Sequence, residues 1–207
     1  GLRHWKSQEK SMTLWFSSDH HIFHKNIIEY GKRPFKDVEE MNEVLIERHN
    51  ALVKPSDHWT CLGDFVMGRD NQGRELGILQ RMNGHKRLIL GIHDHYAMKH
   101  YLIHFEKVMA MNRIDNMWFM HVPCHPMNIG SAKAIIHGHI HQNASPPPVM
   151  KIDKNGKDVI IPYVNISVEV TDYRPLSLEE IKERVEYVKL HAPTFTHIER
   201  GPEDERI

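Results

Sequence analysis

The stretch "LILGIHDHY", Leu88 to Tyr96, joins an apolar run to a turn that carries two histidines and an aspartate. The run has the length and composition of a buried strand, and Gly91 begins the turn. Layered α/β proteins bind their ligands beyond the carboxyl ends of the strands. The stretch therefore predicts an α/β fold with a site at this strand end, and it makes the apolar Ile92 an unexpected neighbour of His93.

The same arrangement recurs along the first two-thirds of the chain. Four further apolar runs, within residues 13–18, 58–65, 117–122 and 133–138, each end in an aspartate or a histidine. The polar residues at the five strand ends are Asp19, His21, Asp64, His93, Asp94, His121, His139 and His141. Each alone fits an ordinary turn or a half-exposed strand position, but five in succession indicate one shared site.

Segments with helical spacing alternate with these strands and predict an α/β layered domain. Helices are expected within residues 36–53, 70–83, 95–105 and 177–190, and late strands within residues 158–170. We interpret residues 12–192 as a single domain. Residues 1–11 are interpreted as an arm that is either added to the natural protein or disordered, and residues 193–207 as a loose tail.

Composition narrows the class of protein. The 207 residues carry 27 basic and 27 acidic side chains, so no overall charge attracts nucleic acid. Two cysteines are too few for a disulfide framework and favour a reducing, cytoplasmic location. No apolar run has the length of a membrane span. Histidine is abundant, with 18 copies, which is typical of metal or acid–base sites.

The strand ends supply carboxylates and imidazoles without thiolates. This ligand set suits borderline divalent ions, with Mn²⁺ expected first and Fe, Zn or Ni as alternatives. Two aspartates and four histidines are too many for one tetrahedral zinc ion. They suit two metal ions about 3.5–4 Å apart, which lower the pKa of a water molecule and neutralise phosphoryl oxygens.

The series of motifs resembles the calcineurin-like metallophosphoesterases, above all the small phage and bacterial members. The motifs are Asp19-x-His21, Gly63-Asp64, Gly91-Ile92-His93-Asp94, His121 and Gly138-His139-x-His141. The resemblance covers Ser17 to about Val170 and implies a central β-sandwich flanked by helices, in four layers α/β/β/α. It implies the following roles: Asp19, His21 and His141 hold one metal, His121 and His139 hold the other, Asp64 bridges them, and His93, oriented by Asp94, assists the leaving group.

Ile92 stands where this family has an asparagine that binds the second metal. An alkyl side chain cannot coordinate, so we expect weaker binding of that ion and slower chemistry. Three explanations stay open: an introduced substitution, natural divergence toward an impaired or one-metal enzyme, and a protein that binds ligand without turnover. His24 and His125 are candidates for substrate contacts, and each also fits an ordinary packing role.

The sequence thus predicts a metal-dependent phosphoesterase that acts on a small substrate. A phosphodiester of a nucleotide or cyclic nucleotide is favoured, because no added cap domain is visible and the groove is expected to be open. The alternatives are a nuclease of the same family and a catalytically impaired nucleotide-binding protein. A structural zinc module would instead unfold when its metal is chelated.

Overall fold

A computed structural model describes residues 12–67, 72–125, 128–152, 155–191 and 196–197. The expected arm, residues 1–11, and most of the expected tail, residues 193–207, lie outside this part of the chain. In chain order the elements are β1 (Leu14–Ser17), α1 (Ile27–Tyr30), α2 (Val38–Leu52), β2 (His58–Cys61), η1 (Arg74–Arg81), β3 (His85–Ile89), α3 (Met98–Tyr101), β4 (Lys107–Met109), β5 (Met111–Ile114), β6 (Met117–Met120), β7 (Ala134–His137), β8 (Val149–Ile152), β9 (Asp158–Ile161), β10 (Tyr163–Asn165), η3 (Val168–Val170), β11 (Leu176–Ser177), α4 (Leu178–His191) and β12 (Thr196–His197).

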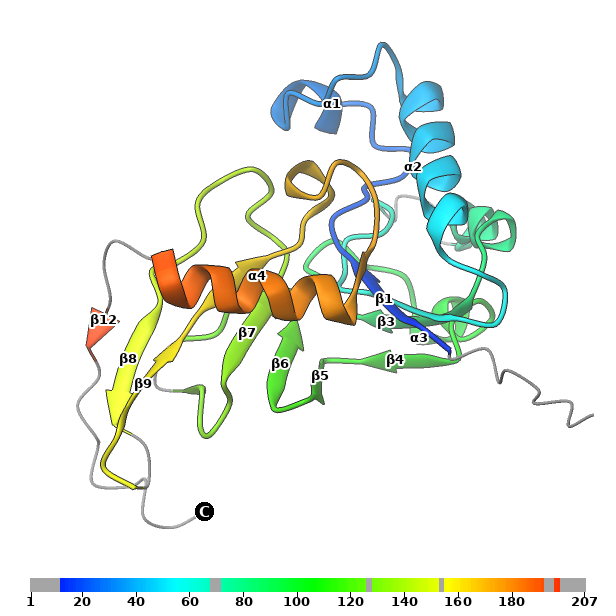
Figure 1. Cartoon of the computed structure of the whole chain (residues 1–207). Coiled ribbons are helices and arrows are strands. Elements are labelled where there is room, and N and C mark those ends of the chain that lie inside the picture. The colour runs from blue at the N-terminus through cyan, green and yellow to red at the C-terminus, as the bar shows by residue number, and fades with distance from the viewer. Residues whose placement is uncertain (1–11, 68–71, 126–127, 153–154, 192–195, 198–207) are drawn as a thin grey trace, which may run out of the picture.

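Two sheets carry the strands that end at the predicted site. In the first sheet the strand order is β11-β1-β2-β3-β4, with β1 to β4 parallel and β11 antiparallel. In the second the order is β10-β7-β6-β5, with β10, β7 and β6 parallel. A smaller sheet, β12-β8-β9, lies beside them (Figure 1). Because parallel strands all point the same way, the polar residues that follow them gather at one end of the sheets.

The core between the two sheets is built from alternate strand residues. Phe16 of β1 and Phe119 of β6 stack across it with ring centroids 4.5 Å apart. Leu62 and Ile89 belong to the same buried cluster. Helix α4 crosses the edge of this sandwich and contacts β1, β10 and β11 (Figure 1). The period-two alternation therefore fixes which face of each strand is buried between the sheets.

The outer faces of the two sheets are covered differently. Met41 and Leu45 of α2 pack with Trp59 and Leu88 on the outside of the first sheet. On the second sheet, Ile135 and Tyr163 pack against the β8–β9 pair through Val149 and Ile161. The expected mixed α/β sandwich is confirmed.

Local signals account for some helix ends and not for others. Helix α2 begins as expected, because Asp37 accepts a hydrogen bond from the Glu40 amide at 2.8 Å. The helix expected within residues 70–83 is a 3₁₀ helix, η1, and the one expected within residues 95–105 is limited to α3. Leu102 and Ile103 follow α3 and are more than half exposed, so a longer helix there would bury little apolar surface. No described helix has the length and apolar character needed to span a membrane.

Candidate metal centre

The predicted ligands stand on tight turns directly after the parallel strands. Five of the six adopt positive φ angles between 51° and 72°, namely Asp19, His21, Asp64, His139 and His141. A left-handed conformation costs a residue other than glycine about 1 kcal/mol or more. Such strain persists only where the surrounding structure enforces it, and it is concentrated at functional sites. These turns therefore orient the ligand side chains, and the strained backbone lowers local stability.

Within the part of the chain that the structure describes, two groups of side chains have ligand atoms within 4.8 Å of one another and could hold metal ions. The first consists of Asp19, His21 and His141, as the sequence predicts for the first metal. The second consists of Asp19, Asp64 and His121, so Asp19 is common to both groups. His139 is in neither group, although its ring centroid lies 5.2 Å from that of His121.

The Asp64 carboxylate lies between the two groups. Its Oδ2 atom is 3.7 Å from Nε2 of His21 and 3.2 Å from Nε2 of His121. Nδ1 of His121 donates to the Leu62 carbonyl at 2.7 Å, which points Nε2 at the carboxylate. Both ring nitrogens of His21 are buried and have no hydrogen-bond partner among the described residues. Buried hydrogen-bond acceptors that face one another would be stabilised by a cation bound between them.

The electrostatics of the pocket favour the metal-binding protonation states at Asp64 and His21. Burial opposes ionisation of Asp64, but the bond to His121 and its charge lower the pKa of Asp64 to about 2. Burial lowers the pKa of His21 to about 2, so its ring is neutral at pH 7. Burial raises the pKa of Asp19, against the attraction of His121 and His141. Bound cations would offset the cost of holding two carboxylates together.

Asp19 is fixed from several sides. Its Oδ2 accepts hydrogen bonds from the His139 amide and from the Ser167 hydroxyl, both at 2.9 Å. Gly138 lies so close that an added Cβ would be 2.3 Å from the same oxygen. A glycine is therefore required where the second sheet approaches the first ligand turn.

A carboxylate that the sequence reasoning missed supports His141. Oε1 of Glu169 accepts a hydrogen bond from Nδ1 of His141 at 2.9 Å, which directs Nε2 toward the first group. Arg33 donates to the same Oε1 and to the backbone carbonyls of Asp19 and His20, at 2.6 to 2.9 Å. Arg33 is thus a buried side chain that holds both Glu169 and the backbone of the first ligand turn. The available signal for Glu169 was one acidic residue within the apolar "NISVEV".

The turn after β3 is tied to Asp64. The Asp94 carboxylate accepts hydrogen bonds from the amides of Asp64 (2.9 Å) and Gly91 (2.7 Å), and the His93 amide donates to Asp64 at 2.8 Å. Burial raises the pKa of Asp94 to about 6, against the bond from Gly91. Within the described residues, Asp94 bonds to backbone amides and not to the His93 ring. Asp94 therefore joins two ligand turns, which differs from the expected orienting of His93.

A hollow of about 320 Å³ opens beside the first group. Its lining includes His21 and His141, together with the predicted catalytic His93 and the substrate candidate His24. His125, the other substrate candidate, is exposed and is not part of this lining. Ile92 is 48% exposed next to His93, so its alkyl chain is presented to solvent.

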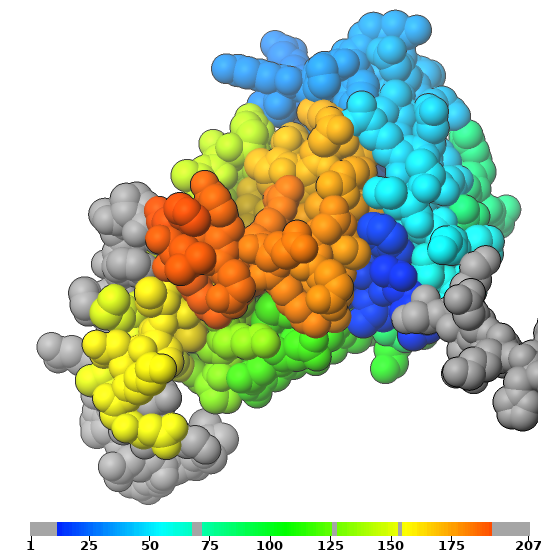
Figure 2. All heavy atoms as spheres, in the orientation of Figure 1, coloured from blue at the N-terminus to red at the C-terminus, as the bar shows by residue number. Residues whose placement is uncertain are grey.

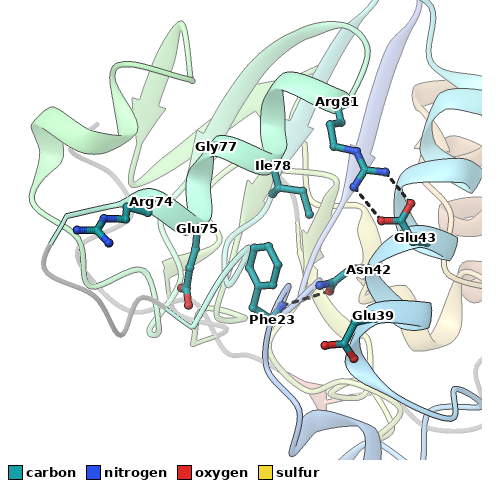
Figure 3. Close-up of a pocket in the computed structure, with 9 residues that line it drawn as sticks. All are labelled: Phe23, Glu39, Asn42, Glu43, Arg74, Glu75, Gly77, Ile78 and Arg81. Atoms are coloured by element: carbon teal, nitrogen blue, oxygen red, sulfur yellow. Dashed lines mark hydrogen bonds and ion pairs between the residues drawn. The ribbon is translucent and has the colours of Figure 1, made fainter.

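A second hollow, of about 380 Å³, lies between α2 and η1 (Figure 3). Phe23 and Ile78 point into it, and Arg81 pairs with Glu43 at 2.6 and 2.8 Å along its wall. It contains none of the residues of the two ligand groups. The chemistry of the strand ends is therefore associated with the first hollow.

Comparison with known proteins gives one long match. No family model matches the chain. An uncharacterized protein of Methanocaldococcus jannaschii, MJ1445, is 32% identical over 178 residues, which are 86% of this chain and 93% of the archaeal protein. The chain belongs to the family of this archaeal protein. The Gene 66 protein of Mycobacterium phage L5 is 36% identical over 110 residues, 48% of this chain and 53% of the phage protein.

Solved structures support the fold. AQ665, a protein of unknown function from Aquifex aeolicus, aligns with a TM-score of 0.62 at 24% identity, covering 84% of this chain and all of that one. A conserved uncharacterized protein of Streptococcus pneumoniae, described as a predicted phosphoesterase, aligns with a TM-score of only 0.34 at 15% identity. The first likeness establishes a shared fold, and the second score is too low to do so.

Proposed function

We propose that the protein is a two-metal phosphoesterase that hydrolyses a phosphodiester of a nucleotide or cyclic nucleotide, with Mn²⁺ as the preferred ion. The observation that carries the proposal is Oδ2 of Asp64, which lies within 4 Å of imidazole nitrogens from both ligand groups. The resemblance of the strand-end motifs to calcineurin-like metallophosphoesterases supports the same function. When bound, the ions would acidify a water nucleophile and offset the charge that builds on the phosphoryl oxygens.

In the proposed reaction, one set of residues would hold the ions and another residue would transfer a proton. Asp19, His21 and His141 would hold one ion and His121 the other, with Asp64 shared between the two. His139, which is adjacent to His121, is a candidate to complete the second set.

His93 would protonate the departing oxygen, because it borders the hollow next to the first ligand group. Its amide donates to the bridging Asp64, so the position of the acid depends on that carboxylate.

A binding protein without turnover is the second candidate, and Ile92 is the observation that favours it. Its alkyl chain supplies no oxygen ligand, so the second ion depends on fewer protein groups than in the family it resembles. If the protein is a binding protein of this kind, it would bind a nucleotide in the presence of Mn²⁺ and release it unchanged.

The test is hydrolysis by metal-stripped protein after addition of Mn²⁺. A chromogenic bis-ester, a chromogenic mono-ester, cyclic nucleotides and single-stranded DNA would be compared as substrates. We expect hydrolysis of the diesters in Mn²⁺, none after chelation, and a loss of about 100-fold or more in Asp64→Asn. Asp172→Asn is the matched control, since Asp172 has a φ of 55° against 53° for Asp64 but is highly exposed and pairs with Arg48.

The substrates separate the candidate functions. Preference for single-stranded DNA would favour a nuclease. Nucleotide binding without hydrolysis of any substrate, in saturating Mn²⁺, would contradict the proposal and favour the binding protein.

A further inference from the structure

The lining of the hollow beside the ligand groups combines two kinds of residue. It includes the imidazoles of His21, His93 and His141, which belong to or adjoin the ligand groups of the proposed function. It also includes Ile27 and Tyr30 of the short helix α1. Figure 2 shows the segment of α1 (blue) at the top of the molecule, above the yellow-green segment that contains the His141 turn. A ligand anchored at the imidazoles would therefore extend toward α1.

Tyr30 presents an open aromatic ring at the hollow. Its side chain is 66% exposed, so the ring is accessible to a ligand. Its ring lies 6.4 Å from that of His24 in an edge-to-face arrangement, which connects it to the imidazole side of the hollow. Gly31 follows directly, and an added Cβ there would be 2.9 Å from the Ile27 carbonyl, so the turn that ends α1 is closely packed.

The geometry points to Tyr30 as the platform on which the base of a nucleoside phosphoester stacks. This inference rests on the proposed function, because the phosphate must be held by the ions near His21 and His141. A volume of about 320 Å³ accommodates a ligand of mononucleotide size. An aromatic face binds any base with little sequence preference, since every base offers a π surface. The hollow would then select nucleosides over small alkyl esters without specifying the base.

The test measures binding by calorimetry, with adenosine 5′-monophosphate and inorganic phosphate as probes in saturating Mn²⁺. The wild type is expected to bind the nucleotide about ten-fold more tightly than phosphate. Tyr30→Ala should lose that ten-fold advantage and leave the affinity for phosphate and for Mn²⁺ unchanged. Tyr30→Phe keeps the ring and should retain the advantage. Tyr187→Ala is the matched control, because Tyr187 is 64% exposed on α4, far from the hollow in sequence and outside its lining.

The outcomes separate this inference from the function on which it rests. If Tyr30→Ala weakens both probes equally, or neither, the stacking role is wrong. If the wild type hydrolyses diesters and binds phosphate but gives the nucleotide no advantage, only the inference fails. If phosphate does not bind in Mn²⁺ and no ester is hydrolysed, the proposed function fails first. A selective loss in Tyr30→Ala that Tyr30→Phe restores would support the platform.

Discussion

At the scale of single residues, Ile92 is the side chain that most directly limits the proposed chemistry. It is 48% exposed beside His93, so a polar replacement would face solvent without disturbing the core. Ile92→Asn would add an amide oxygen as a potential ligand. We expect this change to raise kcat/KM for a diester about ten-fold or more and to strengthen Mn²⁺ binding.

The control for this prediction removes the alkyl chain without adding a ligand. Ile92→Ala should leave both the rate and the Mn²⁺ affinity close to those of the wild type. A similar gain in Ile92→Ala and Ile92→Asn would show that bulk, and not coordination, limits the activity.

Glu169 gives a second prediction at this scale. Its carboxylate fixes Nδ1 of His141 at 2.9 Å and is itself held by Arg33. Glu169→Gln removes the negative charge that keeps His141 oriented and basic, so Mn²⁺ affinity should fall about 10- to 100-fold by calorimetry.

Glu106→Gln is the matched control, because Glu106 also pairs with a histidine, His85, but is half exposed and outside both ligand groups. Unchanged Mn²⁺ affinity in Glu169→Gln would mean that the carboxylate does not position the ligand.

At the scale of elements, the turns after β2 and β3 depend on close backbone approach. A Cβ added to Gly91 would lie 2.2 Å from Oδ1 and 2.5 Å from the amide nitrogen of Asp64. Gly91→Ala should therefore displace the Asp64 turn, lower the free energy of unfolding by about 1–3 kcal/mol and weaken Mn²⁺ binding. Denaturant unfolding and calorimetry measure the two effects.

Gly77 is the natural comparison, since it lies in η1 with nothing within 4 Å of an added Cβ. Gly77→Ala should be neutral or stabilise the protein by up to about 1 kcal/mol. Equal effects of the two substitutions would argue against close approach as the cause.

The sequence predicts elements well where one periodic pattern and a cap coincide. Helix α2 and the strands that end in Asp19, Asp64 and His121 follow directly from apolar runs bounded by polar turns. Strands β4 and β5 were missed, because "KVMAMNRI" has no strict alternation of apolar and polar residues and its strand character depends on pairing with β3 and β6. The helix expected within residues 95–105 was predicted too long, since Leu102 and Ile103, which follow α3, remain exposed.

Within the candidate site, the turns that carry the ligands could be predicted from the sequence. The residues that hydrogen-bond to those ligands could not. Asp19, His21 and His141 form one group as expected, because each directly follows a strand that points toward the same end of its sheet. Glu169 and Ser167 reach the site only through tertiary packing, at sequence separations of 28 and 148 residues from their partners. No local pattern encodes such contacts.

At the scale of the whole molecule, buried histidines couple stability to pH. Burial lowers the pKa of His49 to about 4, and its ring donates to the Asn83 carbonyl at 2.9 Å. The unfolded chain, with a pKa near 6.5, binds more protons between pH 6.5 and 4, so the free energy of unfolding falls as pH decreases through this window. His20 and His137 act in the same direction, since burial lowers their pKa values to about 3 and 4.

His49→Gln removes one of these contributions. Between pH 6 and 5 the variant should lose less stability than the wild type, by up to about 1.4 kcal/mol per pH unit. Urea unfolding of metal-free protein at several pH values measures the difference. Parallel pH profiles for the two proteins would contradict a neutral, buried His49.

Metal removal tests the relation between the site and the fold. The three hydrophobic clusters of the described residues pack without the ligand groups, so chelation should leave the far-ultraviolet circular dichroism spectrum unchanged. Mn²⁺ at 100 times its Kd should stabilise the protein by about 2.7 kcal/mol, which raises Tm by roughly 5–10 °C. Unfolding on chelation would instead indicate a structural metal.

The hydrogen bond between Asp19 and Ser167 joins positions 148 residues apart. It therefore also determines when the site can form during synthesis of the chain. A nascent chain leaving the ribosome presents Asp19 and His21 early, but the groups that hold them appear only when nearly the whole domain has been translated. If the site binds ions as proposed, their capture would therefore come late in maturation, after the second half of the domain has been translated.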